Sequence, residues 1–319
     1  MNPGSETARP TECPGLESLC CLTARLGRCG DLDELLTVSL DALHDLFGFE
    51  HSMLLMLDES GTSLYTIASR GYEPAGIGSE VRVGVGLIGM AAAQGRSIRA
   101  GNLGRMIAYA RVTRQAANGD GDDTDIPLPG LPLVASQIAV PATVMGHTVG
   151  VLTVESAQLG AFTADDERIL GVVAHLVANA IELDRVGATS TASPDTPRPT
   201  PETPVAPALG RPCTVKFFAA DGSTFVDGEY LIKGVAGRIL WRLLTDYQEK
   251  HRTEFTNREV RLDPSLHLPA YRDNLESRLV LLQRRLEERR TPIHLAKMGR
   301  GKFRLSIDGT VQLNGQPDA

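Results

Sequence analysis

The stretch Asn274–Ile307 reads NLESRLVLLQRRLEERRTPIHLAKMGRGKFRLSI and contains a helical pattern followed by two short strand patterns. Its leucines recur at spacings of four, three and four, which places them on one apolar face of an α-helix: Leu275, Leu279, Leu282 and Leu286. Pro292 ends the helix because proline lacks a backbone N–H. The strand patterns, Ile293–Ala296 and Phe303–Ile307, are joined by Lys297–Lys302, so we expect a helix and then a hairpin with a basic tip.

The remaining faces of this helix and the hairpin tip are basic. Between Arg278 and Arg304 there are nine Lys or Arg residues and two acids. Residues 211–319 contain 19 Lys or Arg and 14 Asp or Glu, whereas the rest of the chain contains 13 and 25. A polyanion would therefore be attracted to the C-terminal third. A helix whose charged faces are only solvated is the simpler interpretation.

The preceding segment supplies the other elements of a small domain. A hairpin is predicted at Thr214–Phe218 and Ser223–Asp227, and a helix at Ala236–Tyr247. Thr256-Asn-Arg-Glu259 is a capping box that opens a short second helix. In this order, and with Gly299-Arg-Gly-Lys-Phe at the hairpin tip, residues 213–308 resemble the winged-helix DNA-binding domain of response regulators. No receiver domain precedes them in this sequence.

The resemblance implies a set of residues that contact DNA. Arg284 is expected in the major groove, and Arg300 and Lys302 at phosphate or in the minor groove. Val280 and Leu281 are apolar on the face opposite the leucines, which suggests contacts with thymine methyl groups or with a protein partner. The whole expected set is Ser277, Val280, Leu281, Arg284, Lys297, Arg300 and Lys302.

The N-terminal half predicts helices at Leu16–Gly27 and Asp31–Phe47, with Asp31 as the N-cap of the second. After three short strands, a tight turn is expected at Gly84-Val-Gly-Leu-Ile-Gly89. Two further strands and a long last helix follow. The glycine turn, Ser136-x-x-x-Val-Pro141, Gly150-Val-Leu and Phe162-Thr-x-x-Asp166 occur in the order of a GAF domain, which residues 16–186 resemble. The resemblance implies a six-stranded antiparallel sheet flanked by helices that senses a small molecule or cofactor.

No ligand-specific motif is present, and the sequence therefore leaves the ligand or cofactor unidentified. We expect the pocket to be lined from the segment after Asn102 and from two strands, by Met106, Tyr109, Arg111, Ser136 and Thr153. No metal site is predicted.

Cys20 and Cys21 are candidates for a redox role, but they diverge by about 100° on a helix, and Cys20 falls with the apolar residues. Some GAF proteins are sulfoxide reductases that use cysteines near the pocket. Here no cysteine lies between residues 30 and 212. No catalytic motif was found, and we expect no enzyme activity.

The proline-rich residues 187–212 are interpreted as a linker, and residues 1–15 and 309–319 as tails. The predicted fold class is α+β: a GAF domain followed by a winged helix-turn-helix. We expect a cytoplasmic transcription regulator that binds double-stranded DNA and a small-molecule effector without membrane contact. It would be a homodimer through Leu170, Val173, Val177 and Ala180 of the last helix and leucines of the first. The alternatives are a signalling adaptor that binds a protein through Val280 and Leu281, and a redox-active GAF enzyme.

Overall fold

The computed structural model of the chain describes residues 14–103, 126–190, 212–266, 275–299 and 301–316. The N-terminal domain begins with α1 (Pro14–Leu26) and α2 (Leu32–Phe47), and the chain then forms strands and two more helices. These are β1 (His51–Leu57), β2 (Ser63–Arg70), β3 (Glu80–Arg82), α3 (Gly86–Gln94), β4 (Ile98–Ala100), β5 (Ser136–Val144), β6 (His147–Ser156) and α5 (Ala164–Ser190).

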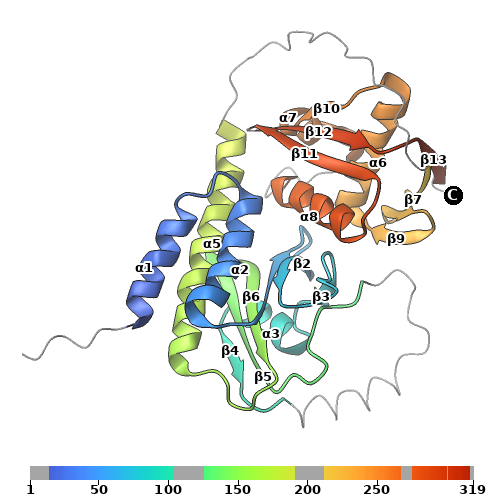
Figure 1. Cartoon of the computed structure of the whole chain (residues 1–319). Helices are drawn as coiled ribbons and strands as arrows, with labels where there is room; N and C mark the ends of the chain where they lie inside the picture. The colour runs from blue at the N-terminus through green and yellow to red at the C-terminus, as the bar shows by residue number, and fades with distance from the viewer. Residues whose placement is uncertain (1–13, 104–125, 191–211, 267–274, 300, 317–319) are drawn as a thin grey trace, which may run out of the picture.

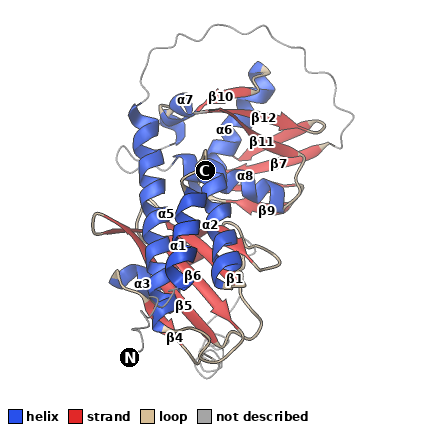
Figure 2. Ribbon diagram, turned by 60° about the vertical axis from the view of Figure 1, so that its left-hand side comes forward, coloured by secondary structure: helices blue, strands red, loops and turns tan. Residues whose placement is uncertain are grey.

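The strands form one antiparallel sheet in the order β3-β2-β1-β6-β5-β4. Successive side chains point to opposite faces. Leu152 and Val154 of β6 join the apolar core under α2 and α5, whereas Val151 joins a smaller cluster beneath α3. Figures 1 and 2 show α1, α2 and α5 layered together. The sheet thus has a thick helical face and a second face covered by α3.

The glycine turn between β3 and α3 is a steric requirement of the backbone. Gly84 and Gly86 have φ angles of 86° and 65°, in the left-handed region that favours glycine. A Cβ on Gly89 would lie 2.2 Å from the carbonyl oxygen of Arg82. The predicted tight turn is present, and its glycines let β3 and α3 approach each other.

The C-terminal domain has two small sheets around two longer helices, α6 and α8. Its elements are β7 (Cys213–Phe218), β8 (Ser223–Val226), β9 (Glu229–Ile232), α6 (Gly234–Lys250), β10 (Glu254–Thr256), α7 (Asn257–Arg261), the 3-10 turn η1 (Pro264–Leu266), α8 (Leu275–Glu288), β11 (Ile293–Gly299), β12 (Lys302–Ile307) and β13 (Val311–Gln316). The sheets have the orders β13-β7-β8-β9 and β10-β12-β11. The strand, helix, helix, helix, hairpin order predicted from the sequence is present.

The interpretation of residues 309–319 as a tail is wrong for its central part. Val311–Gln316 form β13, which pairs in parallel with β7. A Cβ on Gly315 would lie 2.8 Å from the Trp241 ring, so this position packs the strand onto α6. Only two apolar residues, Val311 and Leu313, mark the strand in the sequence, and the pairing with β7 is what makes it regular.

The two domains share one apolar core. A continuous cluster of buried residues runs from Leu36 and Tyr65 in the N-terminal domain to Leu281 and Leu282 of α8. Helix α8 packs against α2 and β2 on one side and against α6, β9 and β11 of its own domain on the other. In Figure 1 α8 lies between the C-terminal sheets and β2. It is buried by both domains.

Candidate functional site

Helix α8 has two buried faces that serve different domains. Leu275, Leu282 and Leu286 are at most 1% exposed and face the core of their own domain, as the leucine spacing predicts. The other face meets the N-terminal domain. Leu281 is 2% exposed, and its side chain lies 3.9 Å from where a Cβ on Gly78 would stand. Val280, 8% exposed, faces the beginning of α2.

This arrangement corrects the expectation that Val280 and Leu281 lie on the outside of the molecule. They do point away from the core of their own domain, but the N-terminal domain covers them. Ser277, another residue of the expected DNA set, is also buried. The periodicity of one helix predicts which residues share a face and says nothing about a second domain that packs there.

Arg278 is the most deeply held cation of this interface. Its Nε and Nη2 donate to the two carboxylate oxygens of Glu59 at 2.8 and 2.5 Å, and its guanidinium lies 4.1 Å from the Tyr65 ring centroid. Only 8% of the residue is exposed. Burial opposes the charge, but Tyr65 and Glu59 outweigh it, so the pKa of Arg278 is raised. The pair and the ring contact hold α8 to β2.

Within the part of the chain that the structure describes, Arg284 donates only to groups of the N-terminal domain. Its Nε donates to the Asp33 carboxylate at 2.6 Å, and Nη2 donates to the Asp33 carbonyl oxygen and to the Thr37 hydroxyl at 2.9 and 2.8 Å. Nη1 donates to the Ile67 carbonyl oxygen at 3.3 Å. The residue expected in the major groove is therefore engaged by α2 and β2 in this structure.

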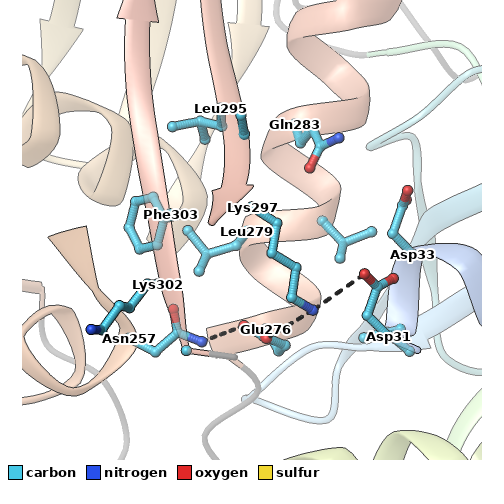
Figure 3. Close-up of a pocket in the computed structure, with 14 residues that line it drawn as sticks. Asp31, Asp33, Asn257, Glu276, Leu279, Gln283, Leu295, Lys297, Lys302 and Phe303 are labelled. Atoms are coloured by element: carbon cyan, nitrogen blue, oxygen red, sulfur yellow. Dashed lines mark hydrogen bonds and ion pairs between the residues drawn. The ribbon is translucent and has the colours of Figure 1, made fainter. Parts of the chain in front are cut away.

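A cleft of about 200 Å³ opens where the beginning of α2 meets α8 and the β11–β12 hairpin. Its floor is apolar, with Leu279, Leu295 and Phe303, and its rim carries charges from both domains. Figure 3 shows the Lys297 amine between two carboxylates; it lies 3.4 Å from Asp31 and 3.7 Å from Glu276. The cleft is the place where acids of one domain meet cations of the other.

Asp31 has a second role, as the residue that caps α2. Its side chain accepts a hydrogen bond from the Glu34 N–H at 3.0 Å, so Asp31 is the N-cap that the sequence predicts for this helix. Burial raises the pKa of Asp31, but the Glu34 N–H and Lys297 outweigh it, and the net shift is downward. Asp31 therefore stays ionised opposite Lys297.

The other residues predicted to contact DNA lie in different places. Lys302 is exposed at the cleft. Arg300 lies outside the described residues. Lys297 and Lys302 border the same cleft, as expected for one basic hairpin, whereas Arg278 was not among the predicted site residues. The signal for Arg278 was present, since it lies one helical turn before Leu281 and Leu282.

On the α3 face of the N-terminal sheet, two neighbouring strands place buried polar side chains side by side. Gln137 of β5 lies opposite Glu155 of β6, and its Nε2 donates to Glu155 and to the Thr153 hydroxyl, each at 3.2 Å. The Tyr72 hydroxyl donates to Glu155 at 3.2 Å. Burial raises the pKa of Glu155, and burial followed by the Glu155 charge raises that of Tyr72. We call Tyr72, Gln137, Thr153 and Glu155 the polar cluster.

Of the predicted pocket residues, Thr153 belongs to the polar cluster and Ser136 does not. The Ser136 hydroxyl donates to the carbonyl oxygens of Gly101 and Gln158 and accepts from Ala161, so it ties backbone segments together. Met106, Tyr109 and Arg111 lie outside the described residues. Gln137 and Glu155 were missed, although polar residues alternating along two adjacent apolar strands are a readable signal.

The cysteines of α1 lie on the other side of the sheet from the polar cluster. Cys20 and Cys21 are both exposed free thiols, which corrects the placement of Cys20 on the apolar face. Helix α1 packs against α2 and buries Leu22 instead. No cluster of three or more metal-binding side chains occurs among the described residues.

The stripe expected to form a dimer is used inside the domain. Leu170, Val173 and Val177 are all 0% exposed, in the core beneath the sheet. The homodimer stays a prediction, and these three residues cannot supply its contacts. Within the part of the chain described here, no helix is both long enough and apolar enough to span a membrane.

Comparisons with known proteins concern the N-terminal domain. The model of the GAF domain family matches residues 29–182. The GAF domain of Acinetobacter phosphoenolpyruvate-protein phosphotransferase is 19% identical, with a TM-score of 0.44, covering 54% of this chain and 94% of that one. The free methionine-R-sulfoxide reductase of Neisseria meningitidis is 21% identical, with a TM-score of 0.43, covering 59% and 99%. No curated protein matched the chain.

Proposed function

Because residues 29–182 form a GAF domain, we propose that the chain is a transcription regulator whose GAF domain senses a small molecule and whose C-terminal domain binds double-stranded DNA. The observation that carries the DNA part is the C-terminal domain itself. Its hairpin, three helices and second hairpin occur in the winged-helix order, and the basic residues gather on α8 and on the β11–β12 hairpin.

The polar cluster supports the sensing part. Buried polar groups convey specificity when a ligand completes their hydrogen bonds. Here a carboxylate, an amide, a hydroxyl and a phenol converge on the face of the sheet that carries α3. A buried carboxylate favours a ligand that carries hydrogen-bond donors, such as an amine or amide. We therefore propose a small polar effector with N–H groups.

The DNA part is tested with the full chain and a labelled duplex selected from a random-sequence pool. Lys302→Ala is expected to weaken all sequences alike and to lower the salt slope of binding by about one unit. Lys216→Ala is the matched control, because Lys216 is an exposed lysine on β7, away from α8 and the hairpin. If selection yields no duplex that binds more tightly than random DNA, either with the wild type or with a variant whose two domains are separated, the regulator proposal is wrong.

A signalling adaptor is the second candidate function. It is favoured by the apolar pair Val280 and Leu281, which packs against protein rather than solvent. In that case α8 binds either the GAF domain of the same chain or a second protein that displaces the GAF domain from Val280 and Leu281. In such an adaptor, Val280→Asp should abolish function, and the wild type should bind no duplex more tightly than random DNA.

A redox-active GAF enzyme is supported least. Cys20 and Cys21 are exposed on α1, in the helical layer, whereas the polar cluster lies on the opposite face of the sheet, the face that carries α3. A ligand bound at the polar cluster would have the whole sheet between it and these thiols. Retention of ligand binding in a Cys20→Ser/Cys21→Ser variant would separate sensing from thiol chemistry.

A further inference from the structure

We infer that the GAF domain inhibits DNA binding by covering the DNA-reading face of α8 with an acidic patch that takes the place of DNA phosphates. This inference rests on the proposed function and deepens its regulation. The acidic patch consists of Asp31, Asp33, Glu59 and Glu80, and the docked face of the C-terminal domain consists of Lys233, Arg278, Leu281, Arg284 and Lys297.

Each cation of the docked face has a carboxylate partner in the acidic patch. Arg278 binds Glu59 through two donors, Arg284 binds Asp33, Lys297 lies near Asp31, and Lys233 lies 3.3 Å from Glu80. The fork of an arginine that holds a carboxylate through two donors holds a phosphate in the same way. The GAF domain therefore offers the docked face the chemistry that a nucleic acid backbone would offer.

Burial makes the two partners mutually exclusive. A recognition helix reads bases only when it enters the major groove, which is wide enough for one bare helix. Here Arg278 is 8% and Leu281 2% exposed, with α2 and β2 packed on them. Duplex DNA cannot reach this face until the domains separate.

The contact also has features of a reversible one. Beside its apolar centre around Leu281 and the buried Arg278–Glu59 pair, the contact has ion pairs at its edges, such as Lys233–Glu80, whose side chains are 35% and 40% exposed. Edge ion pairs of this kind are weak and screened by salt. Inter-domain contacts of mixed polarity open and close more readily than a domain core.

The size of the effect follows from the open fraction. We call a molecule open when its two domains are separated. When only a fraction of the molecules is open, the apparent dissociation constant for DNA is the intrinsic one divided by that fraction. A change that shifts the chain from one-tenth open to fully open thus tightens DNA binding about tenfold. A ligand at the polar cluster would act on the same equilibrium if it bound the open form better.

Glu59→Arg in the full chain tests the inference, because it places a cation against Arg278 in a surface turn without altering a core residue. We expect a larger radius of gyration by small-angle X-ray scattering and at least tenfold tighter binding of the selected duplex. The charge swap Glu59→Arg/Arg278→Glu should return the radius to that of the wild type. Asp165→Arg, the same charge change at an exposed site on α5, controls for net charge and should do neither.

The outcomes separate the two proposals. The inference is overturned if Glu59→Arg enlarges the radius of gyration but binds the selected duplex no more tightly than Asp165→Arg does. It is also overturned if Glu59→Arg changes neither the radius of gyration nor the affinity for the duplex. If neither the wild type nor the opened variant binds any duplex, the proposed DNA function itself fails. Tighter binding together with opening, reversed in radius by the charge swap, supports both.

Discussion

The guanidinium of Arg278 and the ring of Tyr65 are in face contact, 4.1 Å from carbon to centroid, across the boundary between two domains. Tyr65 belongs to β2 and is 4% exposed, so its ring is a buried surface of the N-terminal domain against which α8 packs. Its hydroxyl is buried without a hydrogen-bond partner among the described residues. Burial raises the pKa of Tyr65, so the ring stays neutral beneath the cation.

Arg278→Ala should lower the free energy of unfolding by about 2 kcal/mol. Breaking a fully buried ion pair costs about 3–5 kcal/mol, and the 23% exposure of the Glu59 side chain reduces the effect. Arg168→Ala removes a partner from an exposed pair on α5 and should change the value by less than about 0.5 kcal/mol. Urea unfolding of both variants measures this. Equal losses would mean that Arg278 is no more important than a surface charge.

In the Glu59→Arg background, Arg284→Ala should weaken DNA binding by about 1–3 kcal/mol. It should also relax the preference for one base at a single position of the duplex. In the wild-type background the loss should be smaller, because the same change also removes the bonds to Asp33 and Thr37 and frees the helix. Fluorescence anisotropy on the four proteins gives the coupling. Identical losses in the two backgrounds would show that Arg284 does not hold the closed arrangement.

Glu155→Gln should make the protein more stable at pH 7 than the wild type. The folded-state pKa of Glu155 is raised by burial, so its stability contribution is complete below the unfolded pKa and is lost as pH rises through the folded value. A glutamine at this position does not ionise, so the variant does not lose stability as the pH rises. The difference in free energy of unfolding between Glu155→Gln and the wild type should therefore shrink as the pH falls toward 4. Urea unfolding between pH 4 and pH 7 measures the difference. A constant difference across that range would contradict the prediction.

Thiol labelling should distinguish the cysteines by position. Cys20 and Cys21 are exposed on α1 and should react rapidly with a maleimide in the native protein. Cys213 is 1% exposed on β7, and burial followed by the charge of Asp227 raises its pKa, which depletes the reactive thiolate. It should react only after unfolding. Mass spectrometry after a short pulse gives each rate, and rapid native labelling of Cys213 would show that β7 opens locally.

The sequence was sufficient where the signal is local. Asp31 caps α2, the Thr256–Glu259 capping box is formed, and the leucine spacing identifies the inner face of α8. These features depend on residues within one or two turns of each other. The same locality explains why the glycine turn before α3 could be interpreted correctly.

The parts that were missed depend on residues far apart in the chain. Glu59 and Arg278 are 219 positions apart, and no pattern in either segment indicates that they meet. Strand β13 is recognisable only once β7 lies beside it. The polar cluster required the register of β5 and β6, which places Gln137 opposite Glu155.

The contact between α8 and β2 does not require both elements to come from one molecule. Residues 191–212 join the two domains, and a segment of that length reaches at most about 75 Å. If the two domains separate as we propose, α8 of one chain would find on β2 of a second chain the same partners as on its own, and a reciprocal exchange would form every bond of the closed arrangement twice. Protein concentration would then decide between a monomer whose α8 is covered by its own N-terminal domain and an exchanged pair in which both α8 helices are covered.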